Sequence, residues 1–232
     1  MSTVGGLIGG IENNKLFDMS FSEMTSVSAE MNSELTGLFI GSVKFNEKSH
    51  LTISNSSSDG LFKGGYYVGG FIGSIAQNQN TDVSFSNCNN NASTDVFYMN
   101  TFGGFIGQIS RNVNFDVTLS LCKNDGVIIG WGYAGGFVGF IPGNKNISIQ
   151  IIQSNNNGTI QGNESAGGFI GTTSKNTNMS LKFTNNVNEK EVVGTDSGGF
   201  IGRLLDFAFV SFVHCQSDTS IEDVDCYGCS HG

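Results

Sequence analysis

Gly69-Gly70-Phe71-Ile72-Gly73 is the repeated motif of this chain, and close copies of it recur along its whole length. The copies begin at Gly5, Gly37, Gly69, Gly103, Gly135, Gly167 and Gly198. The intervals between successive copies are therefore 32, 32, 34, 32, 32 and 31 residues. A unit of this length cannot bury its apolar residues alone and must stack on its neighbours. We therefore expect one elongated repeat body over residues 1–214, followed by a cysteine-containing tail or cap over residues 215–232.

The composition of the 232-residue chain favours strands and turns over helices. Gly contributes 33 residues and Pro only 1, while charged residues make up 13%, against about 25% in typical globular proteins. A hydrophobic fraction of 38% argues against disorder. The net charge of −9 and the lack of a basic run argue against a nucleic-acid partner. No apolar run approaches the ~18 residues of a membrane-spanning helix, and no cofactor-binding motif is present.

Each copy of the motif is followed by a corner and then by a strand. The residue nine places after the first Gly is asparagine in six copies, namely Asn14, Asn46, Asn78, Asn112, Asn144 and Asn176. Asparagine tolerates the left-handed conformation of a tight corner, and stacked asparagines can hydrogen-bond along a ladder. The next segment alternates, as in Asp82-Val83-Ser84-Phe85-Ser86, which predicts a strand with one buried face and one hydroxyl-rich face.

These features predict an all-β protein, namely a parallel β-solenoid of seven coils of about 32 residues each. We expect about three short strands per coil and a right-handed sense, because parallel crossover connections are right-handed. A β-propeller is the alternative, but its blades need four strands in about 40–50 residues. The observed repeat is short for such a blade.

The motif together with the corner Cys122-Lys123-Asn124-Asp125-Gly126 and the strand that follows resembles the GLUG-motif repeats. Those repeats occur in bacterial IgA-peptidase-like and adhesin-like surface proteins and in protist surface proteins. The resemblance covers essentially the whole chain, although Phe stands where the motif usually has Leu. It implies a β-solenoid, a location outside the cell or at its surface, and a stalk or adhesive scaffold without catalytic residues.

The apolar residues of the motif and of the two end coils are candidates for an assembly surface. Phe71 and Ile72 are adjacent in the strand, so they should face opposite ways, and the set equivalent to Ile72 would form a lateral stripe. The alternative is that the glycines kink the strand and turn both sets inward. The candidate interface residues are Val4, Leu7, Ile8, Ile72, Ile106, Val138, Ile170, Ile201, Leu205, Phe207 and Phe209. We expect self-association through coil ends or laterally, which favours a non-enzymatic filament, stalk or adhesive scaffold.

Asp82 and Asp116 are the alternative functional candidates. They are equivalent in adjacent repeats, so their carboxylates should lie roughly 5–7 Å apart on the wet face of a strand. Such a pair could bind a cation or serve in a carbohydrate-binding or carbohydrate-active β-helix. A solvated pair without a function is the simpler interpretation.

The cysteines and the glycosylation sequons complete the set of candidates. Cys88, Cys122 and Cys215 fall at one repeat position, which indicates a reduced ladder, whereas Cys226 and Cys229 indicate a disulfide in the tail that could involve Cys215. A Cys/His zinc cap is the alternative for the tail. Asn91 and Asn157 lie in sequons at corners and are the glycosylation candidates if the chain is secreted by a eukaryote.

Overall fold

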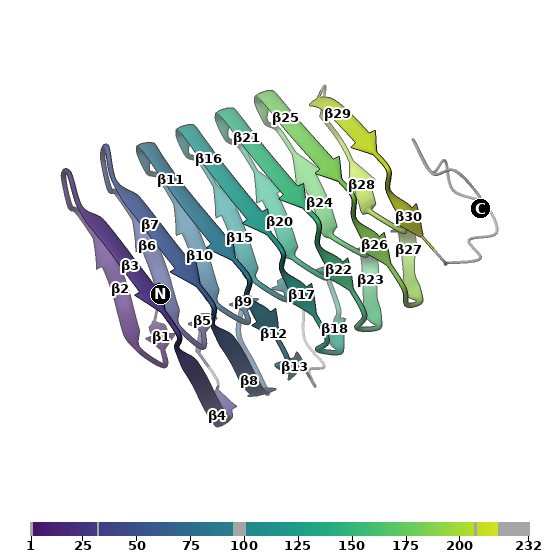
Figure 1. The fold of residues 1–232 in the computed structure, drawn as a ribbon, viewed down its shortest axis with the longest axis horizontal. Coiled ribbons are helices and arrows are strands. Elements are labelled where there is room, and N and C mark those ends of the chain that lie inside the picture. The colour runs from purple at the N-terminus through teal and green to yellow at the C-terminus, as the bar shows by residue number, and fades with distance from the viewer. Residues whose placement is uncertain (1, 32, 95–100, 207, 218–232) are drawn as a thin grey trace.

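The protein is a parallel β-solenoid, as the repeat predicts. The computed structural model describes residues 2–31, 33–94, 101–206 and 208–217. Strand pairings among these residues are parallel and join each strand to its equivalent in the adjacent repeat. The coils therefore stack along the long axis of the molecule, from purple at the N-terminal end to yellow at the C-terminal end (Figure 1).

Four sheets run along this stack. Sheet A contains β1 (Thr3–Gly5), β5 (Leu35–Gly37), β9 (Tyr67–Gly69), β14 (Thr101–Gly103), β18 (Ile128–Gly130), β19 (Tyr133–Gly135), β23 (Ile160–Gly167) and β27 (Val192–Gly198). Sheet B contains β2 (Ile8–Glu12), β6 (Ile40–Lys44), β10 (Ile72–Ala76), β15 (Ile106–Ser110), β20 (Val138–Pro142), β24 (Ile170–Ser174) and β28 (Ile201–Leu204).

The other two sheets follow in each coil. Sheet C contains β3 (Asp18–Ser22), β7 (His50–Ser54), β11 (Gln79–Ser86), β16 (Val113–Ser120), β21 (Lys145–Ile152), β25 (Thr177–Thr184) and β29 (Ala208–Val213). Sheet D contains β4 (Thr25–Met31), β8 (Ser57–Phe62), β12 (Asn89–Asn90), β13 (Ser93–Thr94), β17 (Lys123–Asn124), β22 (Asn155–Asn156), β26 (Val187–Asn188) and β30 (Gln216–Ser217). Sheet C lies in front of sheet B in Figure 1.

Sheets B and C each have seven strands, one from each copy of the motif. The expectation of about three strands per coil was too low, because sheet D adds a fourth strand where the sequence indicates only a corner. Its inner strands are as short as two residues, such as Lys123–Asn124 and Asn155–Asn156. Asparagine side chains hydrogen-bond from coil to coil inside this sheet and keep the short strands in register.

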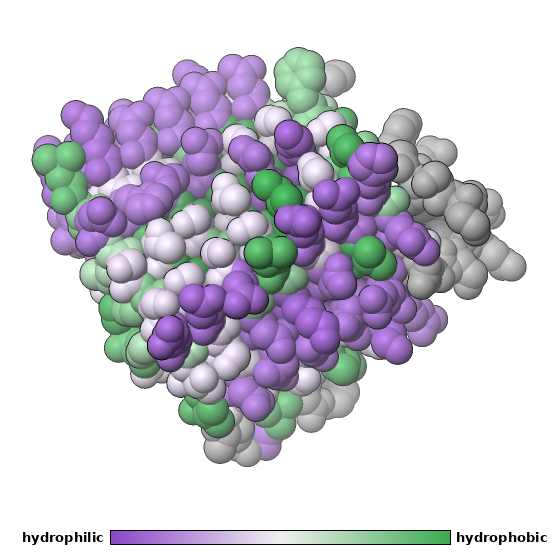
Figure 2. All heavy atoms as spheres, in the orientation of Figure 1, coloured by the Kyte–Doolittle hydropathy of each residue, from purple (hydrophilic) through white to green (hydrophobic). Residues whose placement is uncertain are grey.

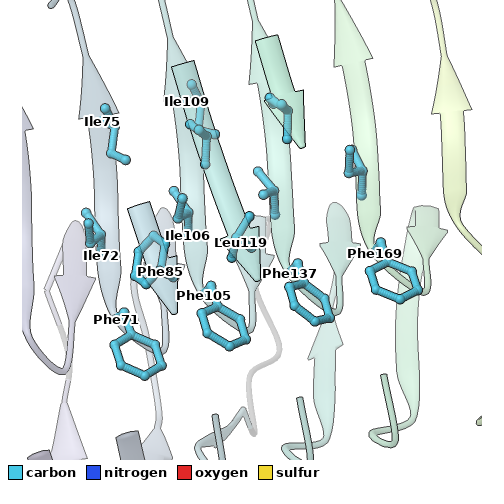
Figure 3. Packing of buried hydrophobic residues seen from close by; sticks show 14 of the residues in the cluster. Phe71, Ile72, Ile75, Phe85, Phe105, Ile106, Ile109, Leu119, Phe137 and Phe169 are labelled. Carbon is cyan, nitrogen blue, oxygen red and sulfur yellow. The ribbon is translucent and has the colours of Figure 1, made fainter. Parts of the chain in front are cut away.

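The aromatic residue of the motif forms the centre of the core. Phe71, Phe105, Phe137 and Phe169 lie one above another between sheets B and C (Figure 3). Their ring centroids are 5.0, 4.9 and 4.8 Å apart in successive coils. These distances follow the strand spacing of about 4.8 Å, so the stack fixes the coils in register. All four side chains are fully buried.

The glycines of the motif provide clearance for the stacking of the backbone. A Cβ atom at Gly70 would overlap the carbonyl oxygen of Gly104 in the next coil and the Oδ1 atom of Asn90. A Cβ atom at Gly73 would lie 2.7 Å from the backbone nitrogen of Thr36, where sheet A passes over sheet B. The glycines thus serve contacts within one chain.

Of the two alternatives for the apolar residues of the motif, a lateral stripe or two inward-facing sets, the structure shows the second. Ile72, Ile106, Val138 and Ile170 have no exposed surface and pack in the same core as the phenylalanines, as Figure 3 shows for Ile72 and Ile106. Both sets turn inward because Phe71 lies in the bend between β9 and β10, and β10 begins only at Ile72, so the two residues do not alternate within one strand. The inclusion of these four residues in an assembly surface was therefore wrong.

The corner asparagines form a ladder, as predicted, and the ladder has a direction. In each coil the Nδ2 atom donates to the Oδ1 atom of the next coil, from Asn14 through Asn46, Asn78, Asn112 and Asn144 to Asn176, at 2.8 to 3.0 Å. Backbone N–H groups of the same residues donate to the same Oδ1 atoms. Asp206 accepts from Asn176 at the end of the row. We call this row the corner ladder.

A second buried ladder was missed in the sequence. Asn90, Asn124, Asn156 and Asn188 donate from Nδ2 to the next coil in sheet D, at 2.7 Å between the asparagines. Ser58 donates into its start, and Ser217 accepts at its end. The spacing of 34, 32 and 32 residues between these asparagines was the signal that could have revealed it.

An exposed third row lies beside the corner ladder and has the opposite direction. Asn114, Asn146 and Asn178 each donate from Nδ2 to the Oδ1 atom of the preceding coil, beginning with Asn80, at 2.8 to 3.0 Å. The four residues have φ angles of 50 to 53°, a left-handed conformation that asparagine adopts at low cost. The Asn-x-Asn pattern thus places one row inside the corner and one outside.

Candidate functional site

The outer face of sheet C carries the carboxylates that the sequence singled out. Asp18, His50, Asp82 and Asp116 are register partners in four successive strands. Ser148 and Ser180 continue this row, and hydroxyl-bearing residues dominate the parallel rows beside it. Figure 2 shows this side of the molecule, where hydrophilic and near-neutral residues cover most of the surface. The predicted placement of Asp82 beside Asp116 is confirmed.

His50 is the residue of this row whose part the sequence did not suggest. Its Nδ1 atom pairs with the carboxylate of Asp82, and its Nε2 atom lies 3.1 Å from the hydroxyl of Thr52. That hydroxyl also lies 3.1 Å from the hydroxyl of Ser84. The spacing of 32 residues from Asp18 to His50 and again to Asp82 was the available signal.

The charged groups of the row are only partly buried. Partial burial, and then the neighbouring carboxylate of Asp82, raise the pKa of Asp116 above its usual value. The side chains of His50 and Asp82 are 47% and 46% exposed, so water screens their charges. Chemically, the row offers carboxylates, an imidazole and hydroxyls at steps of about 4.8 Å, which suits a ligand with repeated hydroxyl groups.

The N-terminal coil leaves apolar side chains incompletely covered. Ile8, Met19 and Phe21 point inward but are only partly buried, whereas the equivalent Ile40, Leu51 and Ile53 of the next coil have no exposed surface. Val4 and Leu7 are exposed at the same end. The strands β2 and β3 are the terminal strands of sheets B and C, so their backbone edges are open among the described residues.

The C-terminal coil mirrors this situation. Ile201, Val210 and Phe212 face the core but are partly exposed. Leu205 is 54% exposed and Phe209 is 84% exposed. Phe207 lies outside the described residues. Of the candidate assembly residues that the structure describes, those at the two ends are therefore at least partly exposed, and those between the ends are not.

The cysteines of the described chain are free and buried. Cys88, Cys122 and Cys215 are thiols, as a reduced ladder requires, so Cys215 is not part of a disulfide here. Hydrogen bonding with Cys88 and burial raise the pKa of the Cys122 thiol, which keeps it protonated at neutral pH. Cys226 and Cys229 lie outside the described residues, and the disulfide between them stays a prediction.

The two glycosylation candidates differ in their accessibility. Asn91 is exposed, although its Oδ1 atom accepts a hydrogen bond from Asn89. Asn157 is half-buried, and its Oδ1 atom is enclosed without a hydrogen-bond partner in the structure. An enzyme that modifies the amide would reach Asn91 more easily. Modification at either residue stays a prediction.

Two further observations concern metals and membranes. Among the described residues, no group of three or more His, Cys, Asp or Glu side chains is arranged to hold a metal ion. In the same part of the chain there is no helix with the length and apolarity to cross a membrane. Comparison with known proteins found no matching family model and no similar sequence among curated proteins.

Proposed function

We propose that the protein is a non-enzymatic structural scaffold, a rigid segment of an extracellular or cell-surface filament, stalk or adhesive layer. One observation carries this proposal: core side chains at both ends of the rod, such as Ile8 and Phe212, are left partly exposed. Another coil stacked on either end would bury them and pair the open strand edges. The resemblance to GLUG-motif repeats of surface proteins supports the proposed location.

The proposed partner at these ends is a second copy of the chain. The N-terminal coil carries the same motif as the inner coils, Gly5-Gly6-Leu7-Ile8-Gly9, so it is shaped to receive another coil. At the other end Phe200 stacks on Phe169 with ring centroids 5.0 Å apart. In a head-to-tail arrangement Leu7 of the second copy would continue this column of rings.

Substitution of Leu7 by lysine tests end-to-end association. Leu7 is 40% exposed, so the fold should tolerate the change, but a charge at this position would have to be desolvated on docking. We expect the wild-type chain to show concentration-dependent oligomers in sedimentation velocity, and Leu7→Lys to weaken association at least about tenfold. The control Leu121→Lys, at a position 55% exposed between the two ends, should behave like wild type. Monodisperse wild-type rods at all concentrations would contradict the proposal.

A second candidate function is the binding of a polysaccharide along the outer face of sheet C. The observation that favours it is the row from Asp18 to Asp116, with the His50–Asp82 pair at its centre. Repeated hydroxyls of a glycan chain could donate to the carboxylates and exchange hydrogen bonds with the neighbouring hydroxyl rows.

The double substitution Asp82→Ala and Asp116→Ala tests this candidate on a glycan array. We expect wild type to bind a subset of neutral or basic glycans and the double variant to lose that binding. Asp59→Ala, a change of an exposed carboxylate in sheet D, should retain it. The absence of any glycan bound by wild type, or equal binding by both variants, would exclude this role for the row.

A further inference from the structure

The C-terminal coil fits on the N-terminal coil of a second copy along most rows of side chains. If the strand register continues across the junction, Ile201 meets Ile8 in sheet B, because both belong to one row of register partners. In sheet C, Val210 meets Met19 and Phe212 meets Phe21 for the same reason. These rows match apolar residues with apolar residues, and all of them are partly exposed in the single chain.

Two rows do not match: on the outer face of sheet C, Phe209 would meet Asp18, and inside the junction the corner ladder is mismatched. Its amides donate toward the C-terminal coil, and each Oδ1 atom accepts from the coil before it. Asp206 stands at the end of this row and accepts from the backbone N–H of Asn176 at 2.9 Å and from its Nδ2 atom at 2.7 Å. An ionised carboxylate only accepts hydrogen bonds, so Asp206 has no side-chain hydrogen to pass to a following coil.

At the opposite end, the ladder begins with an unused acceptor. Asn14 donates from its backbone N–H and from Nδ2 to the Oδ1 atom of Asn46, both at 3.0 Å. No described residue donates to its own Oδ1 atom, which is the atom that would accept from a preceding coil. In a continued stack this oxygen of Asn14 faces the carboxylate of Asp206, acceptor against acceptor.

The backbone beside Asp206 also has no need of a side-chain amide at this position. In inner coils the ladder amide donates a second hydrogen bond to a carbonyl of the preceding coil, as Asn176 does to Ile141 at 2.7 Å. The equivalent carbonyl for Asp206 is that of Thr173, a register partner of Ile141. The backbone N–H of Leu205 donates to this carbonyl at 3.2 Å, so it is satisfied without a side-chain amide.

The buried ladder of sheet D creates no such conflict. It ends at Ser217, whose hydroxyl accepts from Asn188 at 3.3 Å. A hydroxyl both donates and accepts, so this row does not end on an acceptor-only group. Of the two buried ladders, the corner ladder is thus the one that ends on an acceptor-only group, Asp206.

We propose that Asp206 limits end-to-end joining of this chain with a second copy of itself. The inference rests on the proposed function and names the residue that regulates the association of the coil ends. The matching apolar rows draw the C-terminal coil of one copy to the N-terminal coil of the next. The carboxylate of Asp206 opposes that contact because it must be desolvated against the Oδ1 atom of Asn14 without a hydrogen bond. The joint is therefore weak and reversible in the wild-type chain.

The substitution Asp206→Asn of the full chain tests this inference. An amide keeps an acceptor for Asn176 and adds the donor that all inner coils have. We expect the association constant measured by sedimentation velocity to rise at least about tenfold, from one hydrogen bond gained and one charge removed. Negative-stain images should show longer rods of unchanged width. Asp59→Asn changes the net charge equally at an exposed site in β8 and should leave association unchanged.

The outcomes separate this inference from the proposed function. Suppose that wild type associates and that Leu7→Lys weakens this association. If Asp206→Asn then has the association constant of wild type, or if Asp59→Asn raises that constant as much as Asp206→Asn does, the role of Asp206 is wrong and the scaffold proposal stands. If neither wild type nor Asp206→Asn associates at any concentration, both are wrong. The double variant Asp206→Asn and Leu7→Lys should lose the rise in association constant, which would show that the rise depends on contact between the coil ends. A thermal melt of Asp206→Asn confirms that it folds.

Discussion

Replacing Gly136 by alanine should lower the free energy of unfolding by about 4 kcal/mol, at the upper end of single-residue effects. A Cβ atom there would overlap the carbonyl oxygen of Gly168 and lie 2.6 Å from the Oδ1 atom of Asn156. The Asn156 oxygen accepts from Asn124 within the buried ladder of sheet D, and the Gly168 oxygen belongs to the backbone of the next coil. Relief of the overlap would need a shift of the buried Asn156 side chain and of the backbone of the next coil, so the strain cannot relax locally.

Urea denaturation followed by far-UV circular dichroism measures this effect. The matched control is Gly9→Ala, because the nearest atom to a Cβ at Gly9 is the carbonyl oxygen of Thr3 at 4.0 Å. We expect that control to change stability by less than about 0.5 kcal/mol. Similar stabilities for the two variants would show that the glycines are not needed for clearance. Repeat proteins can unfold in parts. The urea midpoint from circular dichroism should therefore be compared with the midpoint from a second spectroscopic probe.

Substitution of Asn112 by alanine should cost about 3 to 5 kcal/mol, because each buried polar group left without a partner costs about 1–3 kcal/mol. The Oδ1 atom of Asn112 accepts from the backbone N–H and the Nδ2 atom of Asn78, while its own Nδ2 atom donates to Ile75 and Asn144. The side chain is fully buried, so water cannot replace these bonds.

Asn14→Ala is the control for position in the ladder. Asn14 is exposed, and its side chain donates only to Asn46 and to the carbonyl of Glu12 among the described residues. We expect a loss below about 1 kcal/mol at this end. Differential scanning calorimetry of both variants provides the comparison. An equal loss at both positions would mean that the ladder contributes through the corner conformation and not through the continuity of its hydrogen bonds.

The repeat was readable from the sequence because the same physical demand recurs in every coil. A glycine that must avoid the next coil's backbone cannot vary, so Gly69 and its equivalents mark the period directly. The alternation of Asp82 to Ser86 predicted the faces of sheet C correctly, since an ordinary strand has period two. The same rule was wrong for Ile72, because Phe71 lies in a bend before β10 and the two residues do not alternate within one strand.

The parts that the sequence did not reveal depend on contacts between coils. The row of Asn90, Asn124, Asn156 and Asn188 looked like ordinary turn residues, because asparagine is common in turns and its burial cannot be read from one repeat. His50 gains its partner only when the stack places it beside Asp82. The exposure of Met19 at the N-terminal end likewise follows from its position in the stack and not from its own sequence.

The direction of the corner ladder also has an electrostatic consequence. Amide groups that all donate toward one end form a row of aligned dipoles, with partial positive charge at the C-terminal coil, as peptide groups do toward the N-terminus of an α-helix. A carboxylate at that end is attracted to the row, and Asp206 holds this position. The charge of Asp206 that opposes docking of a second copy thus also stabilises the C-terminal coil of the unassociated chain, much as an acidic residue stabilises the first turn of a helix.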